Sequence, residues 1–280
     1  MSKYNEYFKS VSLGEDYDVA TSLSLAVACD LAYKSKKTIN ETARKWKFPK
    51  VEFIQVKKKH DIDTQCFVMA NKKSIIVVFR GSDSKSDWFA NFQAVRDPGP
   101  LKGTKAHEGF QDALFPAVIS LTNVIDKFRT NKQKICLTGH SLGGAQCLLY
   151  AGMLIENGYD VDGIYTFASP RPADRNFSNQ LKKYMKKNKS PHFRVVNTGY
   201  VVPHVPPEPF FSHTGERIIL KDDERLVEKS SWLEQQYEAV KAFADKVADR
   251  FDIANNHRLS ADKESYIHRL IKHYERESGK

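Results

Sequence analysis

The chain has 280 residues, of which 41% are hydrophobic and 28% are charged, a balance typical of a globular protein. A chain of this length can bury a full hydrophobic core, and we expect a single domain spanning residues 1–280. No apolar run approaches the roughly 18 to 20 residues that a membrane-spanning helix needs, and no secretory signal is recognisable at the start. We therefore expect a cytoplasmic or otherwise intracellular protein, with nonclassical secretion as the alternative.

The cysteines and the charge distribution bear on compartment and partners. The four cysteines form no CxxC pair, which favours buried thiols in a reducing compartment. The net charge is +10, and five lysines fall in a stretch without Asp or Glu from Arg175 to Pro207: Lys182, Lys183, Lys186, Lys187 and Lys189. Such a patch favours contact with an anionic membrane surface, with a simple solvated helix face as the alternative. No nucleic-acid-binding motif accompanies it, so no nucleic-acid partner is expected.

Apolar runs alternate with segments of helical periodicity along much of the chain. Strands are predicted at Val51–Val56, Cys66–Ala70, Ser74–Phe79, Ile135–Thr138, Gly163–Phe167, His192–Asn197 and Ile218–Leu220. Helices are predicted at Glu108–Arg129 with an interruption near Pro116, and at Ser141–Glu156, Asn176–Lys187, Leu226–Phe251 and Asp262–Glu275. This alternation predicts an α/β fold with a mostly parallel central sheet and helices on both faces.

A glycine-rich turn, GHSLGG at residues 139–144, follows the apolar run KICLT and precedes the helical segment AQCLLYAGML. A serine at a sharp strand-to-helix turn needs small neighbours two residues away on either side, because the backbone packs tightly there. Such a turn raises the serine Oγ above the sheet edge and directs a helix N-terminus at the site. We interpret Ser141 as the nucleophile of an α/β-hydrolase. The alternative is a phosphate-binding glycine turn with an incidental serine.

Five sequence blocks occur in a recognisable order: VVFRGSDSKSDWFANF, AHEGF, LTGHSLGGA, YTFASPR and VVPHVPP. Together they resemble the signature blocks of the class 3 (fungal-type) triacylglycerol lipases, over a stretch from about Ser74 to Leu220. The resemblance implies an α/β-hydrolase fold, no cofactor or metal, a Ser-Asp-His triad, and hydrolysis of acylglycerols or phospholipids.

Acyl transfer needs hydrogen-bond donors aimed at the oxyanion that forms at the attacked carbonyl, each worth about 10²–10³ in rate. One donor should be the backbone N–H of Leu142, the residue after the nucleophile. The resemblance implies that Ser82 supplies the other donor. The alternative for Ser82 is an ordinary turn residue.

The segment Ser84–Gln93 corresponds to the lid of the family. It would place Trp88, Phe89 and Phe92 on one side of a short helix, which could close on an acyl groove or turn towards a lipid surface. The alternative is an ordinary helix that faces the core.

Nine histidines compete for the role of general base. The sequence around His257, NHRLS, resembles the late His-x-Leu-Ser block of the family, and it follows Ser141 in the chain order expected for this fold. At the position of the family's aspartate stands Tyr200, and no carboxylate lies between Asp174 and Glu208. Asp174 is the alternative acid, although capping of the following helix is the favoured role for it.

We therefore expect a serine hydrolase that acts on lipid esters, as an acylglycerol lipase or a phospholipase A1-type enzyme. Ser141 would attack the ester carbonyl, His257 would transfer the proton, and water would release the acyl-enzyme. Loss of the triad aspartate alone costs about 10⁴ in kcat, so a Ser–His pair would be weak but not inert. The alternative is a catalytically weakened α/β-hydrolase that acts as a scaffold or regulatory protein, because the expected acid is Tyr200.

Overall fold

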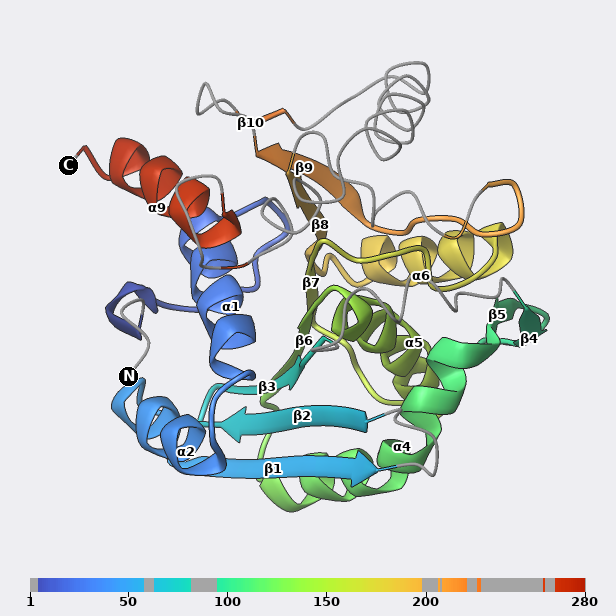
Figure 1. The fold of residues 1–280 in the computed structure, drawn as a ribbon, viewed down its shortest axis with the longest axis horizontal. Helices are drawn as coiled ribbons and strands as arrows, with labels where there is room; N and C mark the ends of the chain where they lie inside the picture. Colours follow the sequence, from blue (N-terminus) through green and yellow to red (C-terminus); the bar gives the residue numbers. More distant parts are fainter. Residues whose placement is uncertain are drawn as a thin grey trace.

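A computed structural model describes residues 5–57, 63–81, 95–197, 206, 208–220, 226–227, 259 and 265–279. Its centre is an eight-stranded sheet in the order β1-β2-β3-β6-β7-β8-β9-β10 (Figure 1). The strands are β1 (Lys50–Lys57), β2 (Asp63–Ala70), β3 (Ser74–Phe79), β6 (Lys134–His140), β7 (Gly163–Phe167), β8 (His192–Asn197), β9 (Glu216–Leu220) and β10 (Leu226–Val227). A separate two-stranded ribbon consists of β4 (Arg96–Pro98) and β5 (Lys105–His107).

The sheet is parallel at its centre and antiparallel towards its edges. β3, β6, β7, β8 and β9 pair in parallel, whereas β1 and β2 on one side and β10 on the other pair antiparallel with their neighbours. Parallel neighbours require crossover connections, which place helices over both faces. The predicted α/β fold with a mostly parallel sheet is confirmed.

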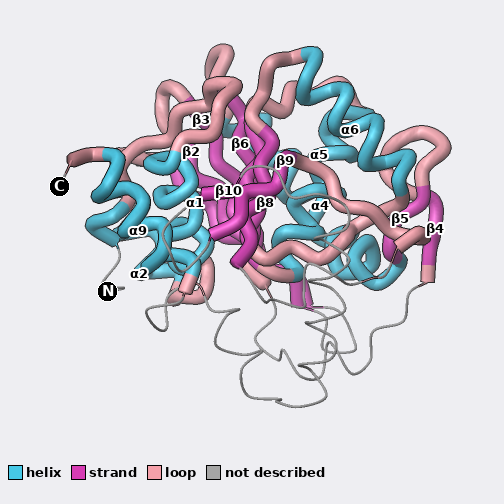
Figure 2. Tube along the Cα trace, turned by 90° about the horizontal axis from the view of Figure 1, so that it is seen from above, coloured by secondary structure: helices cyan, strands magenta, loops and turns pink. Residues whose placement is uncertain are grey.

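Helices cover the two faces in separate groups (Figures 1 and 2). One face carries α1 (Val19–Leu31), α2 (Lys36–Lys45) and α9 (Tyr266–Glu277), and the other carries α4 (Glu108–Phe128), α5 (Leu142–Glu156) and α6 (Arg175–Lys187). Each group buries its own apolar cluster against the sheet. A short 3₁₀ turn, Asn5–Tyr7, precedes α1. Among the described helices, none is both long and apolar enough to cross a membrane.

Two helices near the N-terminus, α1 and α2, were not predicted. Nearly every residue of α1 is buried, because the helix lies between the sheet and α9, so its sequence has no polar face to reveal a helical period. Asp18 caps α1 by accepting from the N–H of Thr21 at 2.6 Å. In α2 only a narrow stripe that includes Ile39 and Ala43 faces the core.

Two boundaries differ from the prediction for physical reasons. The expected interruption of α4 at Pro116 is wrong, since the helix continues through it. The proline is exposed, and water can therefore reach the carbonyl that loses its helical partner there. The predicted helix Leu226–Phe251 does not begin at Leu226, because Leu226 and Val227 pair with β9 as strand β10. The remainder of that predicted helix lies outside the described residues.

Candidate active site

Ser141 occupies the junction between β6 and α5, near the middle of the sheet. Its backbone has φ 58° and ψ −129°, a region that residues other than glycine rarely adopt. The Ser141 N–H donates to the carbonyl of Phe167 on β7 at 2.9 Å, and the Ser141 carbonyl accepts from Gly144 at 2.8 Å. Although Ser141 is the N-cap residue of α5, its hydroxyl makes no capping hydrogen bond. The Ser141 hydroxyl is therefore not used to cap the N-terminus of α5.

Glycine is required beside this turn because neighbouring backbones pass too close for a side chain. A Cβ on Gly139 would come within 3.0 Å of the carbonyl of Gly143. A Cβ on Gly143 would lie 2.5 Å from the carbonyl oxygen of Phe79 at the end of β3. The two glycines thus allow the ends of β3 and β6 to close onto the start of α5.

The backbone that follows β3 reaches Ser141, the predicted nucleophile, at Gly81. A Cβ on Gly81 would lie 3.1 Å from the Cβ of Ser141, so the two backbones are in close contact. Gly81 directly precedes Ser82, which is outside the described residues. The oxyanion role of Ser82 stays a prediction, and the position of its neighbour is consistent with it.

The backbone N–H of Leu142 is the other predicted oxyanion donor. Leu142 is the first residue of α5, and the first N–H groups of a helix lack partners within the helix and carry partial positive charge. This geometry suits an N–H that would donate to an oxyanion beside Ser141.

Tyr33, just beyond α1, connects the ends of β3 and β6. Its hydroxyl accepts from the Gly81 N–H at 3.1 Å and lies 3.0 Å from Nδ1 of His140. The guanidinium of Arg80 lies over the Tyr33 ring, 5.1 Å from its centroid. Burial raises the pKa of Tyr33, so the hydroxyl is neutral at physiological pH. Sequence reasoning missed Tyr33 because it lies 107 positions from His140, without a local motif.

Tyr266, the first residue of α9, makes a second connection to this region. Its ring packs edge-on against His140, with the centroids 6.3 Å apart. Its hydroxyl accepts from the N–H of Asn197, the last residue of β8, at 3.1 Å. Tyr266 therefore links the end of β8 to the residue that directly precedes Ser141.

The predicted base, the residue at the expected acid position and the lid lie outside the described residues. These are His257, Tyr200, and the lid residues Trp88, Phe89 and Phe92. Their roles stay predictions. Leu259, two positions after His257, is buried, and its carbonyl accepts from the N–H of Ile267 on α9 at 2.9 Å.

Asp174 has a structural role in the fold. It is the N-cap residue of α6, where Oδ1 accepts from the N–H of Phe177 at 2.9 Å. Its other carboxylate oxygen accepts from the N–H of Lys105 on β5 at 3.0 Å. Asp174 therefore caps α6, which is the role that the sequence favoured for it. Another histidine of the signature blocks, His107, caps α4 through Nδ1.

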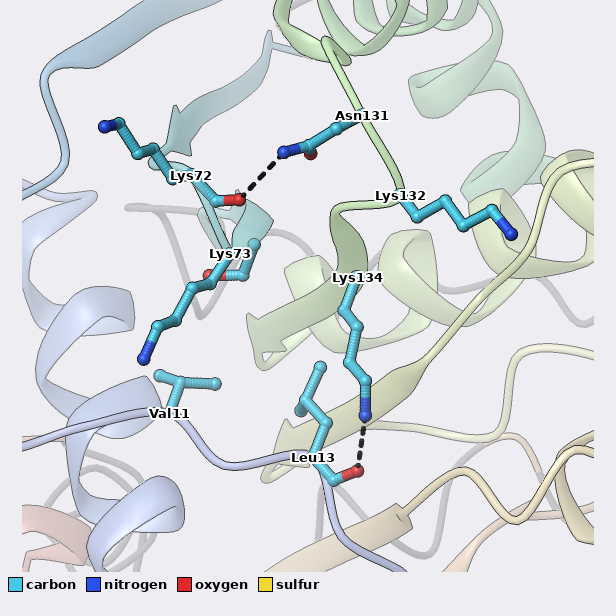
Figure 3. A pocket seen from close by; sticks show the side chains of 8 residues that line it. Val11, Leu13, Lys72, Lys73, Asn131, Lys132 and Lys134 are labelled. Atoms are coloured by element: carbon cyan, nitrogen blue, oxygen red, sulfur yellow. Dashed lines mark hydrogen bonds between the residues drawn. The ribbon is translucent and has the colours of Figure 1, made fainter.

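A pocket of about 620 Å³ lies at the amino ends of β3 and β6, whereas Ser141 follows the carboxyl end of β6. Figure 3 shows the residues that line this pocket. Lys72 and Lys73 lie on one side of this pocket, and Lys132 and Lys134 on the other. Lys134 donates to the carbonyl of Leu13 at 3.4 Å. None of the residues that line this pocket belongs to the turn at residues 139–144.

The fold and the strained serine turn define an α/β-hydrolase. Residues 76–210 match the family described as Lipase (class 3). A lipase from Rhizomucor miehei is 38% identical over 162 residues, which cover 55% of this chain and 43% of that lipase. The chain is therefore similar to the class 3 lipases over this segment. It spans less than half the length of the curated Rhizomucor and Rhizopus lipases that it matches.

Solved structures agree with this family. Lipase II from Rhizopus niveus has a TM-score of 0.59 at 25% identity, with 75% of this chain and 83% of that chain covered. A triacylglycerol lipase whose catalytic centre is a serine protease triad has a TM-score of 0.55 at 26% identity, with 79% and 81% covered.

The expectation of an intracellular protein is wrong by these comparisons. Relatives from Fusarium solani and Malassezia globosa, 31% and 34% identical, are secreted mono- and diacylglycerol lipases, which points to an extracellular location. The cysteines gave a wrong indication of the compartment. They are all buried thiols: Cys29, Cys66, Cys136 and Cys147. A buried thiol packs as a small apolar side chain in any compartment, and burial raises the pKa of Cys29 to about 12.

Replacing Gly139 with alanine should lower the free energy of unfolding by about 1–3 kcal/mol, because the added methyl group would collide with the Gly143 carbonyl. Gly14→Ala is the matched control, since a Cβ there meets nothing within 4 Å, and it should change stability by no more than about 0.5 kcal/mol. Guanidinium unfolding measures both variants. Wild-type stability in Gly139→Ala would contradict the tight turn described here.

Proposed function

We propose that the chain is a serine hydrolase that cleaves carboxylic esters of lipids. The observation that carries the proposal is the strained backbone of Ser141, with the N-terminus of α5 behind it and Gly81 in contact with it. Relatives named lipase, mono- and diacylglycerol lipase and phospholipase A1 support a lipid ester as the substrate class.

In the proposed reaction, the Ser141 Oγ attacks the ester carbonyl and its proton passes to His257. The N–H of Leu142, together with Ser82, donates to the oxyanion, and the tetrahedral intermediate expels the alcohol, which takes the proton from His257. Water then attacks the acyl-enzyme, His257 again receives and returns the proton, and the fatty acid leaves. The roles of His257 and Ser82 rest on the sequence motifs.

A second candidate function is a catalytically weakened hydrolase that serves as a scaffold. Two observations favour it. Tyr200 stands where the family has its aspartate, and both carboxylate oxygens of Asp174 already accept backbone hydrogen bonds. A neutral tyrosine could orient an imidazole but would stabilise its charged form little.

Labelling with a fluorophosphonate ester probe tests the nucleophile directly. We expect the modification to map to Ser141, and Ser141→Ala to abolish both labelling and hydrolysis of a short p-nitrophenyl ester. Ser120→Ala, at an exposed position of α4, is the matched control and should keep both. Wild-type turnover in Ser141→Ala would refute the assignment, whereas an unlabelled wild-type protein would favour the scaffold.

Substitution of Tyr200 by aspartate separates a missing acid from a relocated one. If the acid is missing, Tyr200→Asp should raise kcat by up to about 10⁴, and less where the geometry is imperfect. Asp174→Asn should leave kcat within a few-fold, since asparagine also caps helices. Steady-state kinetics on one soluble ester would measure both. A large loss in Asp174→Asn with no gain in Tyr200→Asp would identify Asp174 as the acid.

The lysines of α6 are proposed to contact anionic lipid. Phe177, Leu181 and Met185 face the core, which leaves Lys183 and Lys187 on the exposed face with their basic neighbours. Lys183→Glu/Lys187→Glu should reduce co-sedimentation with phosphatidylserine vesicles severalfold, and salt should weaken wild-type binding. The charge-matched control is Lys34→Glu/Lys37→Glu, near α2 on the other face of the sheet. Equal losses in the two double variants would show only an effect of net charge.

A further inference from the structure

β8 has two buried basic side chains that the proposed reaction does not use. All six residues of β8 are buried, and Phe193 and Val195 belong to the apolar cluster beneath α1 and α9. Since side chains alternate along a strand, His192 and Arg194 face the other side of the sheet.

Arg194 is 6% exposed, and its Nε is buried without a hydrogen-bond partner. Its register partner on β9 is Arg217, so two like charges stand opposite each other on neighbouring strands. Burial, followed by the charges of Arg217 and Arg171, lowers the pKa of Arg194 to about 9, and the side chain is thus still charged at neutral pH. A buried charged group that leaves a donor without a hydrogen bond lowers the stability of the fold.

The nearby carboxylate of Glu208 already forms an ion pair with Arg171. Nη2 of Arg171 lies 3.5 Å from Oε1 of Glu208, and Nη1 of Arg171 donates to the carbonyl of Pro206 at 2.9 Å. The Glu208 side chain is also 40% exposed, so it is screened by water. Glu208 therefore compensates the charge of Arg194 only weakly.

His192 provides a second, independent indication on the same face of β8. It is 9% exposed, and neither Nδ1 nor Nε2 has a hydrogen-bond partner. Burial, and next the charge of Arg194, lowers the pKa of His192 to about 3, so the ring is neutral and has one N–H to donate. Unpartnered polar groups in a buried position indicate a bound ion or water at that position.

We infer that His192 and Arg194 belong to a binding site for a phosphate group, either free or carried by a small molecule. The planar fork of a guanidinium matches two oxygens of a phosphate, and a neutral imidazole N–H can donate to a third. Phosphate is preferred over a carboxylate because several basic side chains meet here, and phosphate offers three or more acceptor oxygens and nearly two negative charges. The site does not involve Ser141, so it stands whether or not the chain is a hydrolase.

Thermal unfolding of the full chain with inorganic phosphate tests this inference. At about 100 times the dissociation constant, phosphate should raise the wild-type Tm by roughly 5 °C above sodium chloride of equal ionic strength. The rise should be absent in Arg194→Met, which without phosphate should melt no lower than the wild type, because methionine removes the buried charge. Calorimetric titration should give one phosphate per chain in the wild type.

The control is Lys72→Met/Lys132→Met, which removes two cations from the lysine-lined pocket and should keep the full phosphate response. If Arg194→Met does not fold, the half-buried Arg217→Gln replaces it and should weaken phosphate binding at least tenfold. Glycerol 3-phosphate and inorganic phosphate, titrated separately, distinguish a lipid-headgroup source from the free ion. No phosphate response in the wild type, or an equal response in Arg194→Met, would overturn the inference and leave water as the partner.

Discussion

The structure depends above all on the left-handed backbone of Ser141. A residue with a side chain adopts that conformation only when the surroundings hold it there, and the surroundings are the ends of three parallel strands. β7 supplies the carbonyl that accepts from the Ser141 N–H, β6 delivers the residue, and the end of β3 closes against the glycine that follows. The order of these strands is therefore tied to the geometry of this turn, because a different neighbour would leave the turn without one of its supports. The large apolar clusters on both faces supply the stability that offsets this local strain.

Elements with a strong local signal could be predicted from the sequence. Buried parallel strands read as continuous runs of apolar residues, and Ser74–Phe79 is such a run, with all six residues buried. The α6 helix was predicted because three apolar residues recur at helical spacing among lysines. α1 could not be found in this way, since a helix that is buried almost all round has no contrasting face. β10 was misread because its two residues fit a helical pattern, and pairing with β9 is a tertiary effect that no local window contains.

In the candidate site too, features formed by consecutive residues could be predicted, whereas contacts between distant residues could not. The strand-turn-helix at Ser141, the predicted nucleophile, could be found from the sequence because strand, glycines, serine and helix are consecutive in the chain. The supports that come from elsewhere were not visible, namely Tyr33 from the end of α1 and Tyr266 from α9. The pairing of Arg194 with Arg217 was equally hidden, because it arises only when β8 and β9 lie side by side. Composition was the least informative guide, since buried thiols reflect packing and not the compartment.

The position of Tyr33 has a consequence for how the family segment can be used in isolation. The residues that match the family, 76–210, include neither α1 nor α9, although these helices and α2 cover one face of the sheet. A fragment cut to the matching segment would expose the apolar side of β6, β7 and β8 to water. It would also remove the Tyr33 hydroxyl, which accepts from the Gly81 N–H next to Ser141. The segment that matches the family thus lacks part of the structure that supports the turn at Ser141.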